Sequence, residues 1–260
     1  MRQRVITAII ALALLLVVVF VIPAVAAKAV IALLVLGGAW EWSAFVGAPG
    51  VAVRFVYVAL VATTIGFVSL ALGGQTMLVL GVAVVWWLAA LIWTFFFPTP
   101  IPTVLAWISG LLVLVPLHAA LISLYDIAPT ILLFMLLIVW VADSGAYFAG
   151  KKFGRVKLAP RISPGKTWEG VIGGLAAVVL LTLGRAFFVD TNLAVFVPFC
   201  VAVACLSVVG DLTVSMVKRN AGVKDSGNFF PGHGGILDRV DSVSAAAPLF
   251  ALGVNYLGLR

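Results

Sequence analysis

Long apolar segments follow one another from one end of this sequence to the other. The segments run for roughly 18 to 24 residues, the length at which an α-helix crosses a ~30 Å hydrocarbon core. Lipid offers no water to satisfy exposed backbone groups, so open strands are excluded there. The alternating segments of about ten residues that build a transmembrane barrel are not seen in the sequence. The sequence therefore predicts an all-α polytopic membrane protein.

About nine transmembrane helices are expected from the lengths of the apolar segments. Their approximate bounds are residues 5–22, 29–46, 55–72, 77–97, 103–124, 127–149, 170–189, 193–217 and 243–257. No soluble domain or linker interrupts this series, so residues 1–260 are expected to form a single integral membrane domain. Within it, residues 1–125 are N-terminal helices that carry little chemical information. Residues 126–260 hold the candidate catalytic helices and cytoplasmic loops.

The distribution of charge predicts the topology. The chain has 16 Lys and Arg against 9 Asp and Glu, a formal net charge of +7. The basic residues lie in short loops between apolar segments rather than on a soluble face, so nucleic acid is not expected as a partner. The positive-inside rule places a cytoplasmic N-terminus, Arg54 and the loops at residues 151–166 and 218–239 on one side, and Lys28 outside. Both charged loops then face the same compartment.

Residues 207–241 concentrate charge in a chain of which only 10% is charged. This stretch contains four carboxylates and four cations: Asp211, Asp225, Asp238, Asp241, Lys218, Arg219, Lys224 and Arg239. An ordinary soluble domain has about a quarter of its residues charged. Such a concentration between apolar segments therefore indicates a chemical site rather than a solvated surface.

A polar stripe is expected along the eighth apolar segment. Its polar residues recur at intervals of four, four and three, namely Ser207, Asp211, Ser215 and Lys218. This spacing places them on one face of an α-helix. A carboxylate at this depth needs a partner, either a cation or a metal ion. For the two serines, a polar contact between helices is the alternative.

Two further carboxylates precede the last apolar segment. Asp238 and Asp241 are three residues apart and share a face if the ninth helix begins early. Asp241, together with Ser242, is alternatively a suitable N-cap for a helix that begins later. Asp238 would lie upstream of such a cap, so capping does not account for it.

A glycine-rich loop lies between the polar stripe and these two carboxylates. Gly232, Gly234 and Gly235 surround His233. Glycines at this density let backbone amides approach a ligand closely, which suits phosphate. Mg²⁺ uses one or two carboxylates and completes its shell with water and phosphate oxygens. Carboxylates, glycine loop and clustered cations together therefore predict Mg²⁺ bridging a polyphosphate.

A second cluster is formed by residues 163–167, which read Ser-Pro-Gly-Lys-Thr. The Gly-Lys-Thr triplet is shared with P-loops, but Pro160 stands where that motif requires glycine and no preceding β-strand is expected. A Gly-Lys-Thr turn at a helix N-terminus is expected instead, where amides and the helix dipole favour an anion. A basic loop that only enforces topology is the alternative, and it accounts poorly for Lys166.

A third polar position lies near the cytoplasmic end of the sixth apolar segment, where Asp143 is followed by Ser144. Ionisable residues inside membrane spans are costly and usually have a partner. Asp143 is therefore expected either to pair with a residue of the basic loop or to provide a further metal contact.

The charged stretch resembles the signature of the phosphatidate cytidylyltransferases, also called CDP-diacylglycerol synthases. The matching positions span some 27 residues and are Ser215, Lys218-Arg219, Lys224-Asp225, His233-Gly234-Gly235, Asp238-Arg239 and Asp241. The segments around residues 163–166 and Asp143 are also similar to this family. The N-terminal half matches only in being hydrophobic.

The resemblance implies that CTP reacts with phosphatidate to give CDP-diacylglycerol and pyrophosphate, in phospholipid biosynthesis at the cell inner (plasma) membrane. It implies Asp211 and Asp238 as metal ligands, with Asp241 as a weaker third. The implied cofactor is Mg²⁺, with or without a second cation. Ser215 would support the metal site. A homodimer is also implied.

The resemblance further implies which residues meet the two substrates. Cations expected at the phosphates of CTP or of the lipid are Lys218, Arg219, Lys224 and Arg239. The remaining positions expected in substrate binding are Ser163, Lys166, Asp225, His233, Gly234, Gly235 and Asp143. Phosphatidate would enter sideways from the bilayer, while CTP would arrive from the cytoplasm.

Two alternatives remain open at this point. A CTP-dependent enzyme acting on another lipid would show the same signature, because the sequence does not reveal the choice of headgroup or acyl chain. A transporter of phosphorylated solutes would also place carboxylates in helices. Such a transporter is expected to spread its charges over both halves with interrupted helices in matching positions, whereas here the charges cluster on one face.

Overall fold

The computed structural model describes residues 2–45, 50–71, 75–189, 192–227, 229 and 234–257. Within these residues the chain forms helices and one short hairpin. The helices are α1 (Arg2–Phe20), α2 (Ala24–Ser43), α3 (Val51–Ala71), α4 (Thr76–Phe95), α5 (Thr103–Ile127), α6 (Pro129–Phe153), α7 (Trp168–Arg185), α8 (Leu193–Asn220) and α9 (Leu237–Leu257), and the strands are β1 (Lys157–Ala159) and β2 (Ser163–Thr167).

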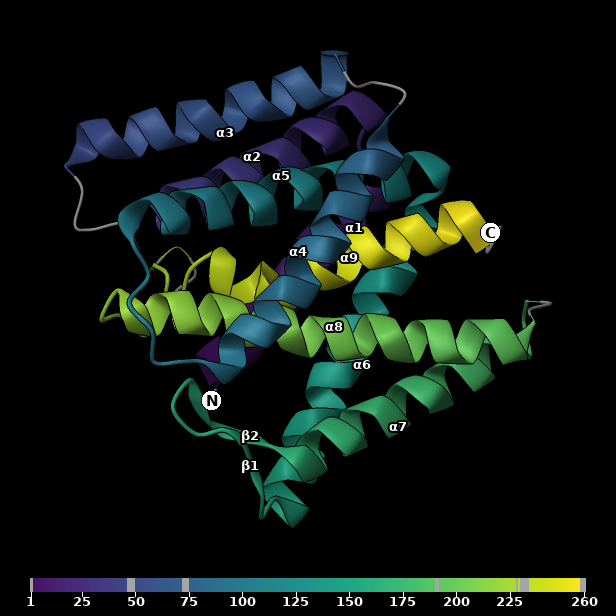
Figure 1. Cartoon of the computed structure of the whole chain (residues 1–260). Helices are drawn as coiled ribbons and strands as arrows, with labels where there is room; N and C mark the ends of the chain where they lie inside the picture. Colours follow the sequence, from purple (N-terminus) through teal and green to yellow (C-terminus); the bar gives the residue numbers. More distant parts are fainter. Residues whose placement is uncertain are drawn as a thin grey trace.

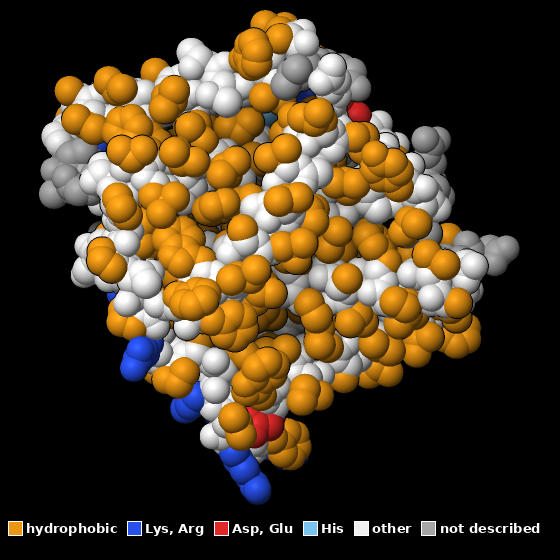
Figure 2. Space-filling model, viewed as in Figure 1, with side chains coloured by type: hydrophobic (Ala, Val, Ile, Leu, Met, Phe, Trp, Pro, Cys, Tyr) orange, Lys and Arg blue, Asp and Glu red, His pale blue; other side chains and the backbone are white. Residues whose placement is uncertain are grey.

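The helices have the length and composition of membrane spans. Eight of them, α2 to α9, are long and apolar enough to cross a bilayer, and α1 contributes a shorter apolar stretch, Ile9–Phe20. Figure 2 shows hydrophobic side chains covering most of the visible face, with Lys and Arg gathered at its lower edge. The prediction of an all-α polytopic membrane protein is therefore confirmed. The cytoplasmic N-terminus stays a prediction.

Helix α9 occupies the centre of the bundle. It packs against α2, α4, α5, α6 and α8, so both halves of the chain meet on it (Figure 1). Three consecutive alanines, Ala245 to Ala247, are fully buried within it. Small residues let helix backbones approach closely in a membrane. At Gly210 of α8, an added Cβ would lie only 2.5 Å from the backbone oxygen of Asp241.

Helices α2, α3 and α5 lie side by side on one side of this centre, and α6 and α7 form a pair on the other (Figure 1). The α6–α7 contact is made through glycines. An added Cβ on Gly174 would lie 2.5 Å from the backbone oxygen of Ala142, and one on Gly145 would lie 3.1 Å from the Cα of Gly174. This close packing fixes the segment that links the two helices.

That segment is the antiparallel hairpin of β1 and β2, in which Lys157 lies opposite Thr167 and Ala159 opposite Ser163. The expected Gly-Lys-Thr turn is therefore wrong, because these residues form strand β2, and the expectation that no strand precedes them is wrong as well, because β1 does. The expected helix N-terminus is present directly after it. Thr167 caps α7, since its Oγ1 accepts a hydrogen bond of 3.2 Å from the backbone N–H of Gly170.

Candidate active site

A cavity of about 570 Å³ opens where the hairpin meets four helices. Its polar lining comes from Asp143 and Lys151 of α6, Ser163, Lys166 and Thr167 of β2, Asp211 of α8, and Asp238, Asp241 and Ser242 of α9. Its apolar lining includes Val171 and Leu175 of α7 and Ala204 and Val208 of α8. Residues predicted from three separate parts of the sequence therefore meet around one space with both a charged and an apolar wall.

Asp211 connects the polar stripe of α8 to the hairpin. Its Oδ2 lies 2.6 Å from Nζ of Lys166, and its Oδ1 accepts a 3.1 Å hydrogen bond from the hydroxyl of Ser215. Both members of the ion pair are about three-quarters buried, with 24% and 26% of their side chains exposed. The partner that a carboxylate at this depth requires is thus a cation from β2.

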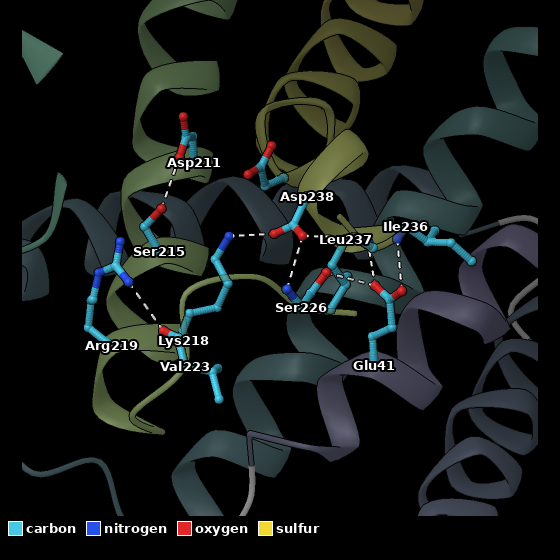
Figure 3. A network of polar contacts seen from close by, with 12 residues as sticks. Glu41, Asp211, Ser215, Lys218, Arg219, Val223, Ser226, Ile236, Leu237 and Asp238 are labelled. Carbon is cyan, nitrogen blue, oxygen red and sulfur yellow. Dashed lines mark hydrogen bonds and ion pairs between the residues drawn. The ribbon is translucent and has the colours of Figure 1, made fainter. Parts of the chain in front are cut away.

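Asp238 forms the second ion pair of the site, which is more deeply buried. Its Oδ1 lies 2.6 Å from Nζ of Lys218, and the two side chains are only 9% and 8% exposed. Its Oδ2 accepts backbone hydrogen bonds of 2.9 Å from Ser226 and from Gly235 (Figure 3). Three donors therefore compensate this carboxylate, as burial of a charge requires.

Asp241 lies one turn beyond Asp238 in α9, and both line the cavity. The early start of the ninth helix is confirmed, because α9 begins at Leu237 rather than near residue 243. The N-cap alternative for Asp241 is consequently wrong, since this residue lies inside the helix. Its Oδ1 accepts a 2.8 Å hydrogen bond from the backbone N–H of Ser242.

Asp143 of α6 reaches the same group of carboxylates. It interacts electrostatically with both Asp211 and Lys166, and it lines the cavity together with Ser242. Asp211 also interacts electrostatically with Asp241. Three acidic side chains from three helices therefore face one another across the cavity, with Lys166 as a nearby cation.

The glycine loop is described at its C-terminal end. Gly234 has a φ of 80°, a conformation that favours glycine, and an added Cβ there would lie 2.5 Å from Oδ2 of Asp238. The backbone N–H of Gly235 donates a hydrogen bond to the same carboxylate and is therefore already satisfied within the protein. His233 and Gly232 lie outside the described residues.

The other cations of the signature do not line the cavity. Arg219 donates to the backbone oxygens of Ile162 and Val223, at 3.3 Å each, and so connects α8 to the hairpin and to the loop (Figure 3). Lys224, Asp225 and Arg239 are exposed. The phosphate contacts expected of Lys224 and Arg239, and the part in substrate binding expected of Asp225, stay predictions.

Ser207 lies on the same helix as the polar stripe, but its hydroxyl contacts none of the stripe's other residues. Its hydroxyl donates to the backbone oxygen of Ala204 in its own helix, at 2.7 Å, and the residue is fully buried. Hydroxyl groups commonly satisfy themselves in this way inside helices. This local bond satisfies Ser207 without a partner on another helix.

Among the described residues, no three acidic, histidine or cysteine side chains are arranged as a ready-made metal site. The donor set nevertheless fits Mg²⁺, which prefers oxygen ligands and usually binds through one or two carboxylates together with water and phosphate oxygens. The carboxylates that line the cavity provide such oxygens.

One buried acidic residue was missed by the sequence reasoning. Glu41 of α2 is 7% exposed and accepts hydrogen bonds from the hydroxyl of Ser226 and from the backbone N–H groups of Ile236 and Leu237 (Figure 3). It belongs to the half of the chain that matched no motif. The signal that could have revealed it was a carboxylate near the end of an apolar segment, which is expensive unless paired.

Known proteins are similar to this chain over almost its whole length. A sequence model described as the Cytidylyltransferase family matches residues 2–257. The chain is 40% identical to the phosphatidate cytidylyltransferase of Pseudomonas aeruginosa over 96% of both chains. It is 37% identical to that of Haemophilus influenzae, over 96% of this chain and 97% of the relative.

A third relative shows that similarity is greater over part of the chain. The phosphatidate cytidylyltransferase of Thermotoga maritima is 48% identical over 42% of this chain and 43% of its own length. The match to the family, by contrast, extends through both the N-terminal helices and the helices that line the cavity. This chain is therefore a member of the cytidylyltransferase family.

Proposed function

We infer that this protein transfers the cytidylyl group of CTP to phosphatidate, giving CDP-diacylglycerol and pyrophosphate for phospholipid biosynthesis. The observation that carries this inference is the cavity, in which Lys166 and four carboxylates face an apolar wall between membrane-spanning helices. Two full-length relatives are named phosphatidate cytidylyltransferases. A site that is charged on one side and apolar on the other suits one water-soluble and one lipid substrate.

The reaction requires little proton transfer. A phosphate oxygen of phosphatidate attacks the α-phosphorus of CTP, and the bond from that phosphorus to the bridging oxygen breaks, so that pyrophosphate leaves. A phosphate monoester has a second pKa near 6 and is largely ionised at pH 7. The nucleophile therefore needs no dedicated general base. The task left to the protein is to bring two polyanions together and to stabilise charge in the transition state.

The cations of the site suit that task. Lys166 extends from β2 into the cavity, and Lys218 holds Asp238 at its edge. We assign Lys166 and Ser163 to phosphate binding at the cavity wall, and Arg219, Lys224 and Arg239 to the surrounding phosphate contacts. The exposure of Lys224 and Arg239 leaves both free to meet a nucleotide that arrives from water.

Asp211 and Asp238 would hold Mg²⁺, with Asp241 and Asp143 adjoining. When bound, such an ion would neutralise charge on the phosphates of CTP. The protein's own contribution is to orient these carboxylates. Ser215 donates to Asp211, while Lys218, Ser226 and Gly235 donate to Asp238.

The multi-pass fold places the reaction at a membrane. We assign the protein to the inner membrane with the hairpin in the cytoplasm, because CTP is supplied there and residues 151–166, which include most of the hairpin, are the most basic loop of the chain. The acyl chains of phosphatidate would remain against the apolar wall formed by α7 and α8. The homodimer implied by the resemblance stays a prediction.

A panel of lipid acceptors tests the choice of substrate. The purified full chain is supplied with radiolabelled CTP, Mg²⁺ and, separately, phosphatidate, a prenyl phosphate or a prenyl alcohol. Lipid-extractable label is expected with phosphatidate. Label only with a prenyl acceptor would replace the proposed substrate by another lipid, and no label with any acceptor would leave the transport alternative to be tested.

A further inference from the structure

Glu41 is a buried carboxylate to which the proposed reaction assigns no part. It lies near the C-terminal end of α2, does not line the cavity, and is 7% exposed. Its Oε2 accepts from the hydroxyl of Ser226 and from the backbone N–H of Leu237, both at 2.8 Å, and its Oε1 accepts from the backbone N–H of Ile236 at 2.9 Å. Among the described residues, the hydrogen-bond donors to this side chain of the N-terminal half all belong to the signature segment.

Two of these three donors belong to the beginning of α9. Helix α9 begins at Leu237, so the N–H groups of Ile236 and Leu237 are among those that have no partner within the helix. A negative charge is favourable at this end of a helix. Glu41 therefore caps α9 from a different helix, as a local N-cap residue does in other proteins.

The third donor connects Glu41 to the catalytic carboxylate. Ser226 donates its hydroxyl to Glu41 and its backbone N–H to Oδ2 of Asp238. Gly235, which directly precedes the residues capped by Glu41, donates its own N–H to the same Oδ2 atom. Figure 3 shows the two carboxylates on either side of Ser226, with Lys218 beyond Asp238.

The loop is shaped to accept Glu41. An added Cβ on Gly227 would lie 2.6 Å from Oε1 of Glu41, and one on Gly235 would overlap both carboxylate oxygens. A glycine at each of these positions lets the loop backbone close around the carboxylate. The fit between α2 and the loop thus depends on residues from both halves of the chain.

We propose that Glu41 is a positioning residue, which holds the loop around Ser226 and the first turn of α9 so that Asp238 faces Lys218 and the cavity. The proposal rests on the proposed cytidylyl transfer, because Asp238 matters for activity only if that site is catalytic. Glu41 acts through Asp238 and touches neither substrate.

Replacing Glu41 by glutamine tests this role with almost no change of shape. Glutamine has one acceptor oxygen in place of two, so its amide group must face at least one of the N–H or hydroxyl donors. We expect kcat to fall about 10- to 100-fold, the usual cost of losing a partner that orients a functional ligand. The KM for CTP is expected to stay within about twofold, because Glu41 does not contact the nucleotide.

Hydrogen–deuterium exchange provides a readout that does not depend on activity. In the Glu41→Gln variant, peptides covering residues 223–240 are expected to exchange faster, since the N–H groups of Ile236 and Leu237 lose their acceptor. Peptides of α6 and α7 are expected to exchange as in the parent. Ser43→Ala is the matched control, because Ser43 is equally buried in α2 but its hydroxyl bonds only the backbone oxygen of Trp40.

Parental kcat in Glu41→Gln, or faster exchange throughout the protein, would overturn the proposal. Should Glu41→Gln fail to fold, Ser226→Ala decides, since it removes the link between the two carboxylates and keeps both backbone donors to Glu41. A local rise in exchange with reduced kcat is expected there, and parental values would again overturn the proposal. Activity of the parent chain reports separately on the proposed function.

Discussion

The ion pair of Lys218 and Asp238 illustrates what a charge inside a membrane protein requires. Both side chains are more than nine-tenths buried, and their 2.6 Å contact is supplemented by two backbone donors to Asp238. The desolvation of two charges offsets much of their mutual attraction, so an intact pair adds little stability compared with apolar residues. Removal of one partner, however, leaves an uncompensated buried charge.

Lys218→Met is therefore expected to lower the free energy of unfolding by about 3–5 kcal/mol. The double variant Lys218→Met, Asp238→Leu is expected to be more stable than the single variant, because no lone charge remains. Thermal unfolding of the purified variants in detergent measures both. A single variant as stable as the parent would show that the backbone donors alone are sufficient for Asp238.

Lys166 is expected to matter more for activity than for stability. Its pair with Asp211 is less deeply buried than that of Lys218 with Asp238, so Lys166→Met is expected to destabilise the protein less than Lys218→Met does. The loss of a cation at the phosphates is expected to lower kcat/KM by about 100-fold or more. Lys157→Met is the control, because Lys157 lies exposed on the neighbouring strand. Equal activity of both variants would remove Lys166 from the site.

At the scale of elements, the α6–α7 pair positions the hairpin and so Lys166. The pair depends on the close approach at Gly174, whereas Gly184 of the same helix has open space around it. Gly174→Ala is expected to destabilise the protein by about 1–3 kcal/mol through overpacking. Gly184→Ala is expected to be neutral or to stabilise by up to about 1 kcal/mol, since alanine is the better helix former.

Thermal unfolding and the transfer assay compare these two alanine variants directly. The unfolding temperature and the transfer activity are both expected to fall for Gly174→Ala, because α6 and α7 must move apart and the hairpin between them moves as well. Equal unfolding temperatures for the two variants would contradict the packing described for this pair.

The elements differ in how far the sequence predicts them. The helices within the apolar segments were predicted because the thickness of the bilayer sets their length. The early start of α9 was only one of two alternatives in the sequence, because Asp238, Arg239 and Asp241 also suit a loop that ends in an N-cap. The first turn of α9 is helical because Glu41 caps it, and Glu41 lies 196 residues before Leu237 in the sequence.

The hairpin was missed for a related reason. Its strands are only three and five residues long, so they show no clear alternation, and their pairing depends on the turn between them and on the helices they join. Within the site, the sequence predicted that the loops near Asp211 and Lys166 lie on the same side of the membrane, but not that these two side chains pair. Glu41 was overlooked because no local motif surrounds it, and only the packing of α2 on α9 brings it to the signature segment.

At the scale of the whole molecule, both halves contribute to one site. The C-terminal half lines the cavity, and the N-terminal half surrounds α9 and supplies Glu41. Near the other end of α2, Lys28 pairs with Asp126 of α5 at 2.6 Å. Thirteen residues of helix, or about 20 Å, separate Lys28 from Glu41 along α2. The molecule therefore has two distinct polar ends.

The predicted topology assigns these ends to opposite sides of the membrane. Single cysteines replacing Lys28 or Lys157, in a chain whose Cys200 and Cys205 are alanine, can be labelled with an impermeant maleimide. In intact cells we expect labelling of Lys28→Cys only, with Lys157→Cys labelled after permeabilisation. The reverse pattern would invert the topology and separate the hairpin from cytoplasmic CTP.

The carboxylates of the cavity are expected to serve cytidylyl transfer. The most direct measurement is the conversion of radiolabelled CTP to a lipid-extractable product by the purified protein with phosphatidate and Mg²⁺. Asp211→Asn and Asp238→Asn are compared with Asp126→Asn, whose carboxylate pairs with Lys28 away from the cavity. We predict activity in the parent and in Asp126→Asn, and its loss in the other two variants. Parental activity in Asp211→Asn and Asp238→Asn would contradict the assigned site.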